Sequence, residues 1–223
     1  MIFILGEGGS GKTTLSFDIL DRERKEGLPR AVILAPDRTN PRMDPLDFTT
    51  DGDGDIDEMA QTFRDSKTDL LVIMENENPR IFEELRRKNE DGAPFYPIIM
   101  GDDMGAMLGE TEMKRAFKAF VRNIRSRQQI VMLSTHRVVD DLPANAHMVT
   151  KWILWVGPMA SVGEADKLYE MGNIRTVMDR ETFREKIAAL PVYNWKLKNQ
   201  DAILAVKQPN MSQPPPPKAL PQK

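Results

Sequence analysis

The sequence predicts an α/β fold in which helices flank a mostly parallel sheet. Short, continuous apolar runs recur along the chain, and such runs are typical of strands that are covered on both faces. Segments with helical periodicity lie between these runs. Because strands that alternate with helices favour crossover connections, we expect most strands to pair in parallel.

Each element follows from a local pattern. The expected strands are residues 2–5, 31–35, 70–74, 97–100, 130–134 and 152–156. The expected helices are residues 12–26, 55–65, 79–89, 110–126 and 161–171. Asn78-Pro79 is typical of a helix start, with Asn as the N-cap and Pro in the first turn.

The pattern changes near the C-terminus. Residues 192–198 and 202–207 flank Asn199-Gln200-Asp201, and this arrangement predicts a β-hairpin at the edge of the same domain. Residues 209–223 are rich in Pro, Gln and Lys, so we expect a flexible or polyproline tail, with a docking peptide as the alternative. The expected organisation is one domain over residues 1–208 followed by this tail.

Composition restricts the function classes. The 223 residues include no Cys, which excludes disulfides, thiolate zinc sites and thiol catalysis. The formal net charge of -3 means that any contact with nucleic acid requires a local basic patch. No apolar stretch reaches the length of a transmembrane helix, so we expect no membrane-spanning segment and a cytosolic protein.

The strongest motif follows the first expected strand. It matches G-x-x-x-x-G-K-[ST] in full and reads Gly6-Glu7-Gly8-Gly9-Ser10-Gly11-Lys12-Thr13. A strand before the motif and a helix after it are the context in which backbone N–H groups cradle phosphates. We expect residues 6–14, including Thr14, to bind a nucleoside triphosphate, with Lys12 at the β- and γ-phosphates and the Thr13 hydroxyl on Mg²⁺.

Two acids complete the expected site. Asp102 and Asp103 follow the apolar residues 97–100, where a strand end places a carboxylate near the metal. We expect Asp102 to hold Mg²⁺ and Asp103 to polarise the attacking water. A turn cap is the alternative role for this pair, and Glu75 is a competing strand-end acid.

A third strand end carries polar groups. Ser134, Thr135 and His136 follow residues 130–133, and the carboxyl ends of strands in an open α/β sheet face the ligand crevice. Thr135 or His136 is therefore a candidate sensor of the γ-phosphate. A polar strand end without nucleotide contact is the alternative.

One helix is strongly basic. Residues 113–137 hold seven Lys or Arg residues and no acid, and Lys114, Lys118, Arg122 and Arg125 recur at helical spacing. The opposite face is apolar and comprises Met113, Phe117, Phe120, Val121 and Ile124. The basic face is a solvated surface, a subunit interface or a surface that meets DNA.

The order of these motifs resembles the FtsK–HerA class of P-loop ATPases, with a RecA/FtsK-like fold. Within the class, residues 130–143 look most like the strand and following turn of genome-packaging ATPases from membrane-containing viruses and phages with double-jelly-roll capsids. Arg125 stands nine residues before Ser134, where the class commonly carries an Arg. The sequence has His136 where the family usually has Gln, and Asp103 where it usually has Glu.

The resemblance implies an ATP- and Mg²⁺-dependent ring, usually hexameric, that pumps double-stranded DNA into a preformed capsid. Its partners would be DNA and capsid or portal-vertex proteins. Its location would be the host cytoplasm or the packaging vertex of the virion. The catalytic residues carried over are Lys12, Asp103, His136 and Arg125.

Other functions remain open at the level of sequence. A motor of the same class could move another cargo, as in conjugation or phage assembly. A small-molecule kinase also uses an N-terminal P-loop, and Arg175, Arg180 and Arg184 are candidates for its lid. A nucleotide-dependent adaptor is a further alternative.

Overall fold

A mostly parallel sheet of eight strands forms the centre of the molecule in the computed structural model, in the order β3-β4-β2-β5-β6-β1-β7-β8. The described residues are 1–28, 30–35, 49–51, 56–66, 69–74, 78–108, 111–122, 124, 128–136, 150–159, 161–171, 174–194 and 196–207. All neighbouring strands pair in parallel except β7 and β8. The strands are β1 (Ile2–Leu5), β2 (Ala31–Ala35), β3 (Thr49–Asp51), β4 (Leu70–Met74), β5 (Ile98–Gly101), β6 (Ile130–Thr135), β7 (Trp152–Val156) and β8 (Ile203–Lys207).

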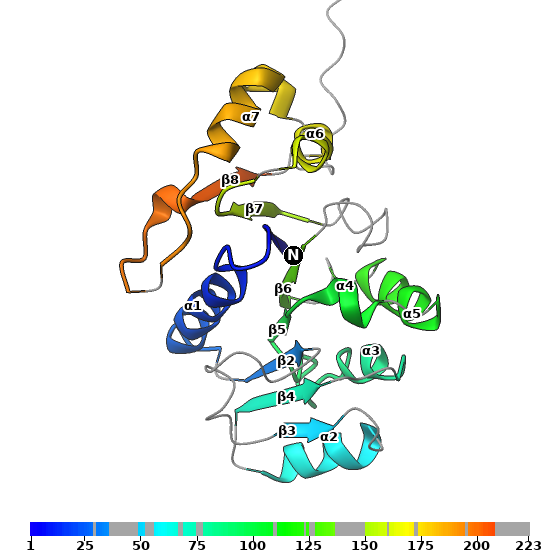
Figure 1. The fold of residues 1–223 in the computed structure, drawn as a ribbon. Coiled ribbons are helices and arrows are strands. Elements are labelled where there is room, and N and C mark those ends of the chain that lie inside the picture. The colour runs from blue at the N-terminus through cyan, green and yellow to red at the C-terminus, as the bar shows by residue number, and fades with distance from the viewer. Residues whose placement is uncertain are drawn as a thin grey trace, which may run out of the picture.

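Helices lie on both faces of this sheet. The α-helices are α1 (Lys12–Lys25), α2 (Ile56–Asp65), α3 (Ile81–Glu84), α4 (Met104–Met107), α5 (Thr111–Arg122), α6 (Val162–Met171) and α7 (Arg180–Ala188). Two 3-10 turns, η3 (Ile174–Thr176) and η4 (Gln200–Ala202), occur in the C-terminal part. Figure 1 shows α1 on one side of the sheet and α3, α4 and α5 on the other.

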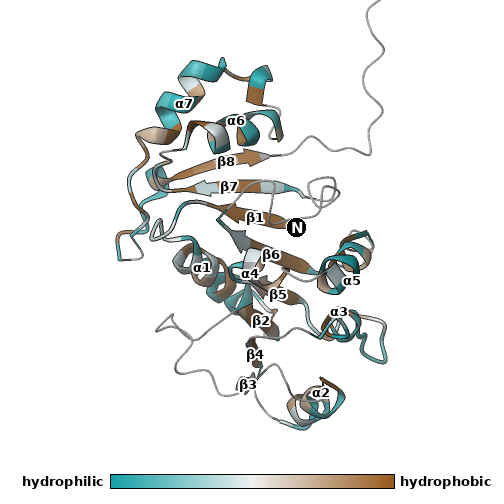
Figure 2. Cartoon of the chain, turned by 45° about the vertical axis from the view of Figure 1, so that its right-hand side comes forward, coloured by the Kyte–Doolittle hydropathy of each residue, from teal (hydrophilic) through white to brown (hydrophobic). Residues whose placement is uncertain are grey.

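The alternation of side chains along the strands creates one apolar core on each face. In β1, Ile4 points to the core under α1, whereas Phe3 and Leu5 point to the core under the other helices. Figure 2 shows apolar residues gathered on the strands and hydrophilic residues on the outer surfaces of the helices. This two-faced burial confirms the α/β class predicted from the continuous apolar runs.

The expected C-terminal hairpin is wrong. Strand β8 forms, but its partner is β7, and the antiparallel register runs from Trp152 opposite Lys207 to Val156 opposite Ile203. The described residues between 192 and 198 are not a strand, because their backbone makes other bonds. The Tyr193 N–H donates to the Ser10 carbonyl at 3.1 Å, and the Lys198 N–H closes a turn on Asn194 at 2.7 Å.

Other boundaries differ from expectation in smaller ways. The third helix is only Ile81–Glu84, and an isolated antiparallel bridge joins Lys88 to Pro94 where the helix was expected to continue. Strand β3 and helices α4 and α7 were not anticipated. The tail over residues 209–223 and the alternative acid Glu75 lie outside the described residues. Among the described residues, no helix is both long and apolar enough to cross a bilayer.

Candidate functional site

The glycine-rich motif forms the connection between β1 and α1, as the sequence predicted. Gly11 precedes the helix with a φ of 98°, a left-handed conformation that glycine adopts without strain. Gly6 has a different role, since a Cβ there would lie 2.4 Å from the Val156 carbonyl oxygen. The first glycine therefore lets the loop pack against β7, and the last one lets it turn into α1.

Lys12 lies at the base of this loop. Its side chain is buried, and Nζ donates to the Glu7 carbonyl oxygen at 2.9 Å and lies 3.1 Å from His136 Nδ1. Burial lowers the pKa of Lys12 from 10.5 to about 8, although Asp103, Asp102 and Glu7 act in the opposite direction. A phosphate beside Nζ would favour the charged form and would raise this pKa again.

Asp102 joins two elements at the end of β5. Thr13 Oγ1 donates to both of its carboxylate oxygens, at 2.9 and 3.0 Å, and Ser134 Oγ donates to Oδ1 at 2.6 Å. Two adjacent oxygens of an octahedral Mg²⁺ shell, each about 2.1 Å from the metal, lie about 3.0 Å apart. The separation between the Thr13 hydroxyl and the Asp102 carboxylate therefore fits a shared Mg²⁺, and these two residues are the ones that would hold it.

A Mg²⁺ ion held by Thr13 and Asp102 would need phosphate ligands as well. Among the described residues, no group of three or more His, Cys, Asp or Glu could hold a metal on its own. Mg²⁺ in nucleotide sites is commonly bound by one or two protein oxygens together with substrate phosphates and water. The donor set of one hydroxyl and one carboxylate matches that chemistry.

Asp103 adopts an unusual backbone conformation beside Asp102. Its φ is 43°, in the left-handed region that few non-glycine residues occupy. Its N–H donates to Ser134 Oγ at 3.0 Å, which holds this conformation. The carboxylate oxygen Oδ2 lies 3.4 Å from His136 Nε2 and is partly exposed to solvent. Asp103 can therefore reach a water molecule at the mouth of the loop.

His136 bridges Lys12 and Asp103. When the Lys12 ammonium donates to Nδ1, the ring proton of a neutral His136 is on Nε2 and faces Asp103. The side chain of His136 remains 46% exposed, so it can move when a ligand enters.

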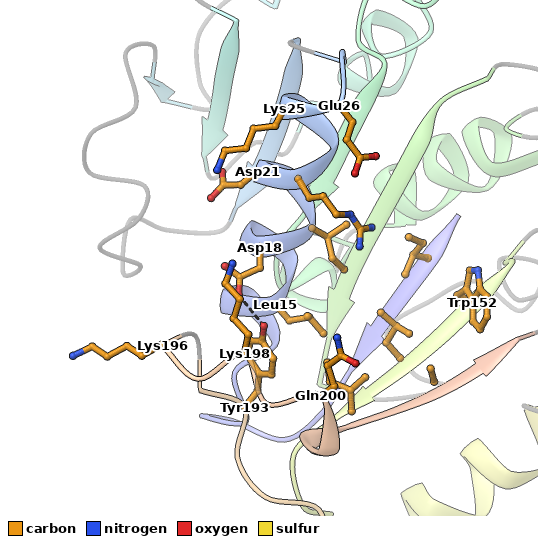
Figure 3. A pocket seen from close by; sticks show the side chains of 16 residues that line it. Leu15, Asp18, Asp21, Lys25, Glu26, Trp152, Tyr193, Lys196, Lys198 and Gln200 are labelled. Atoms are coloured by element: carbon orange, nitrogen blue, oxygen red, sulfur yellow. Dashed lines mark hydrogen bonds between the residues drawn. The ribbon is translucent and has the colours of Figure 1, made fainter.

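These groups surround one pocket of about 270 Å³. Its lining residues are Gly9, Gly11, Lys12, Thr13, Thr14, Asp102, Asp103, Ser134 and His136. A larger hollow of about 1190 Å³ lies between α1 and strands β7 and β8 (Figure 3). That hollow contains no residue of the glycine-rich motif, so the smaller pocket is the candidate phosphate site.

The structure separates some predicted residues from this pocket. Gly6, Glu7, Gly8 and Ser10 belong to the loop but do not line the pocket, and the Glu7 carboxylate accepts a hydrogen bond from the Ser161 N–H at 3.4 Å. Arg125 lies outside the described residues.

The basic residues of α5 do not line the pocket either. The side chains of Lys114, Lys118 and Arg122 are exposed, while the predicted apolar stripe on the other face of the helix is buried. Figure 1 shows this helix on the opposite side of the sheet from α1.

The arginines considered for a kinase lid have other partners. Arg184 makes two hydrogen bonds to Asp166 of α6, at 2.9 and 2.6 Å. Arg180 pairs with Glu170 and lies 3.7 Å from Asp166. These two side chains join α7 to α6 rather than facing the pocket.

Sequence reasoning missed the roles of two residues. Ser134 was seen only as part of a polar strand end, yet its buried hydroxyl contacts Asp102 and the backbone of Asp103. Tyr193 gave no signal, although it contacts the glycine-rich loop from the C-terminal part of the chain.

Comparisons with known proteins identify the fold. No protein-family model matches the chain, and no curated protein sequence matches it. The genome-packaging NTPase B204 of Sulfolobus turreted icosahedral virus 2, solved with ATP-γS, is similar in structure with a TM-score of 0.54 and 16% identity over 93% of this chain and 96% of B204. The DNA-packaging ATPase B204 of Sulfolobus turreted icosahedral virus has a TM-score of 0.54 and 18% identity over 93% of this chain and 96% of its own. VirB4 of Thermoanaerobacter pseudethanolicus has a TM-score of 0.58 and 11% identity over 86% of this chain and 84% of its own.

The chain therefore has the fold of these three proteins, and the likeness extends over nearly the whole length of both B204 chains. At identities of 11–18%, the comparison confirms the predicted fold and leaves the activity to be argued from the site.

Proposed function

We propose that this protein is an ATP-hydrolysing motor that moves double-stranded DNA into a viral capsid. The observation that carries the proposal is the pocket in which Lys12, Thr13, Asp102 and Asp103 converge at the carboxyl ends of β1 and β5. The B204 chains, which have the same fold, are described as genome- or DNA-packaging enzymes, and one was solved with an ATP analogue.

The residues of the pocket divide the reaction between them. The backbone of the loop and Lys12 bind the β- and γ-phosphates, and the Lys12 ammonium offsets their charge. Thr13 and Asp102 would hold Mg²⁺, which would supply positive charge to offset the charge that develops on the phosphate oxygens. Asp103 orients the attacking water, and His136 contacts the γ-phosphate once Lys12 has turned toward the nucleotide.

The exposed face of α5 is the DNA-binding surface in this proposal. Lys114, Arg115, Lys118 and Arg122 are all exposed on a helix whose opposite face is buried in the core. Basic side chains on one helix face bind phosphates without reading base sequence, as a packaging motor requires. The net charge of -3 makes this local patch necessary for attraction to DNA.

In this proposal the protein assembles into a ring, and six subunits are favoured. Capsid or portal-vertex proteins would be the partners to which the ring binds. The ring would act in the host cytoplasm or at the packaging vertex. Arg125 remains a candidate for a contact with nucleotide or with a neighbouring subunit.

A related motor with another cargo is the second candidate. The similarity to VirB4 over 86% of this chain favours it. The kinase alternative is weaker, because Arg180 and Arg184 are paired with carboxylates of α6.

ATP turnover with and without double-stranded DNA tests the proposal. We expect turnover to rise when DNA is added and to rise with protein concentration as subunits assemble. The double variant Lys118→Glu/Arg122→Glu should lose DNA stimulation and keep basal turnover, because both positions are exposed and outside the pocket. Lys186→Glu/Lys196→Glu, which reverses two exposed charges elsewhere, is the matched control. ATP turnover that is independent of DNA and requires a small phosphoryl acceptor would support the kinase instead.

A further inference from the structure

The segment between α7 and β8 crosses the outer side of the glycine-rich loop. The Tyr193 N–H donates to the Ser10 carbonyl at 3.1 Å, and the Gly157 N–H donates to the Ala202 carbonyl at 2.9 Å. The first bond joins the segment to the loop, and the second joins it to the end of β7. Residues 191–194 are therefore held directly against the phosphate-binding motif.

Tyr193 covers Gly11 on a side that does not face the phosphate pocket. A Cβ at Gly11 would lie 2.8 Å from Tyr193 Cβ and 2.9 Å from its carbonyl oxygen. Tyr193 lines the larger hollow between α1 and β8 (Figure 3). Gly11 lines the phosphate pocket instead. At Gly11 the loop therefore separates the phosphate pocket on one side from Tyr193 on the other.

The phenol ring extends this contact to the helix. Tyr193 Oη donates to Asp18 Oδ2 at 2.8 Å, the bond drawn as a dashed line in Figure 3. Asp18 follows Thr14 by one helical turn, so both residues lie on the same face of α1. Only 7% of Tyr193 is exposed, so the ring has little freedom to leave this position.

We propose that Tyr193 is a positioning residue for nucleotide binding: through Ser10, Gly11 and Asp18, it holds the loop in its phosphate-binding shape before the nucleotide arrives. The inference rests on the proposed nucleotide site and is independent of the DNA cargo. A loop rich in glycine has high conformational freedom, and ordering it during binding weakens affinity. Once nucleotide is bound, the phosphates themselves hold the loop.

The expected signature is a change in affinity without a change in maximal rate. Tyr193→Phe keeps the ring and removes the bond to Asp18, so the Kd for a fluorescent ADP analogue and the KM for ATP should rise by about threefold to tenfold. Tyr193→Ala also uncovers Gly11, and its Kd should rise further. In both variants kcat at saturating ATP should stay within about twofold of the wild type, because the bound phosphates restore the loop.

Two controls separate positioning from general stability. Tyr169→Phe removes another buried tyrosine hydroxyl, which donates to the Met178 carbonyl at 2.9 Å in the α6–α7 region. Its Kd should equal that of the wild type. The double variant Tyr193→Phe/Asp18→Ala should lose less affinity than the sum of the two single variants, because both changes remove the same bond.

The results that would overturn the inference are equally specific. Unchanged Kd and KM in Tyr193→Ala would show that the loop needs no support, and a loss of kcat at unchanged KM would show a different role. An equal rise of Kd in Tyr169→Phe would show that the loss of affinity reflects general stability and not positioning of the loop. If the wild type bound no nucleotide, the site itself and this inference would both fail. If turnover were independent of DNA, only the motor proposal would fail.

Discussion

Replacing Ser134 by Ala should weaken the response to Mg²⁺ more than it weakens the fold. The Ser134 hydroxyl donates to Asp102 Oδ1 at 2.6 Å and accepts from the Asp103 N–H at 3.0 Å, and the residue is 1% exposed. Removing one buried partner of a charged group costs about 1.5–3 kcal/mol, and the Asp103 N–H loses its acceptor as well. We therefore expect the free energy of unfolding to fall by about 2–4 kcal/mol.

The functional effect follows from the orientation of Asp102. Without the Ser134 hydroxyl, this carboxylate keeps, among the described residues, its hydrogen bonds from Thr13, and it can turn away from the proposed metal position. Loss of a group that orients a metal ligand typically reduces metal affinity by about 10–100-fold. The half-saturating Mg²⁺ concentration for ATP turnover should rise by that factor, and high Mg²⁺ should restore much of the rate.

Ser16→Ala is the matched control for this experiment. Ser16 is equally buried, and its hydroxyl donates to the Lys12 carbonyl at 3.0 Å, an uncharged acceptor. Its Mg²⁺ dependence should equal that of the wild type. The reasoning would be refuted if Ser134→Ala kept a normal Mg²⁺ response, or if both variants shifted it equally.

Three further predictions follow from the same site. Asp102→Asn should impair Mg²⁺-dependent nucleotide binding, whereas Asp103→Asn should leave binding intact and slow hydrolysis by about 10²-fold or more if Asp103 acts on the water; equal, mild effects would show that the metal-binding strand is misplaced. Because only charged Lys12 binds phosphate well and its pKa is about 8, nucleotide affinity should be greatest below pH 8 and fall above it by about tenfold per unit. Lys12→Arg should bind more weakly but show no such decline, since Arg stays charged, and a wild-type affinity that is flat to pH 10 would contradict the shift. Deleting residues 209–223 should leave the melting temperature and ATP turnover unchanged, because a Pro-rich segment buries little apolar surface; a large fall in melting temperature would show that the tail packs on the domain.

The parts of the site that the sequence predicts are those encoded in short segments. The glycine-rich motif needs only a strand before it and a helix after it, and both are visible as local periodicity. Asp102 could be found because it follows a buried strand, and the carboxyl ends of parallel strands share one edge of a sheet. Thr13 and Asp102 are 89 positions apart in the chain, yet their contact was predictable from these two local patterns.

The missed features depend on contacts that leave no local pattern. Tyr193 meets Asp18 across 175 positions, and no periodicity near residue 193 indicates that contact. The expected helix over residues 79–89 ends early partly because the Gln129 side chain donates to the carbonyls of Leu85 and Tyr96, at 2.9 and 3.0 Å. Strand β8 showed the predicted β pattern, but a pattern does not specify which strand becomes its partner.

The proposal that this protein moves along double-stranded DNA is tested most directly with a triplex substrate, in which a third DNA strand is bound to a duplex. The measurement is the rate at which ATP drives release of the third strand. A protein that moves along double-stranded DNA should release the third strand at a rate that depends on ATP. Lys12→Ala should bind the duplex and release nothing, because the β/γ-phosphates lose their main charged partner. Release is expected with the wild type and ATP, and no release is expected with a non-hydrolysable analogue. Wild-type protein that hydrolyses ATP in the presence of the duplex but never displaces the third strand would contradict the proposal.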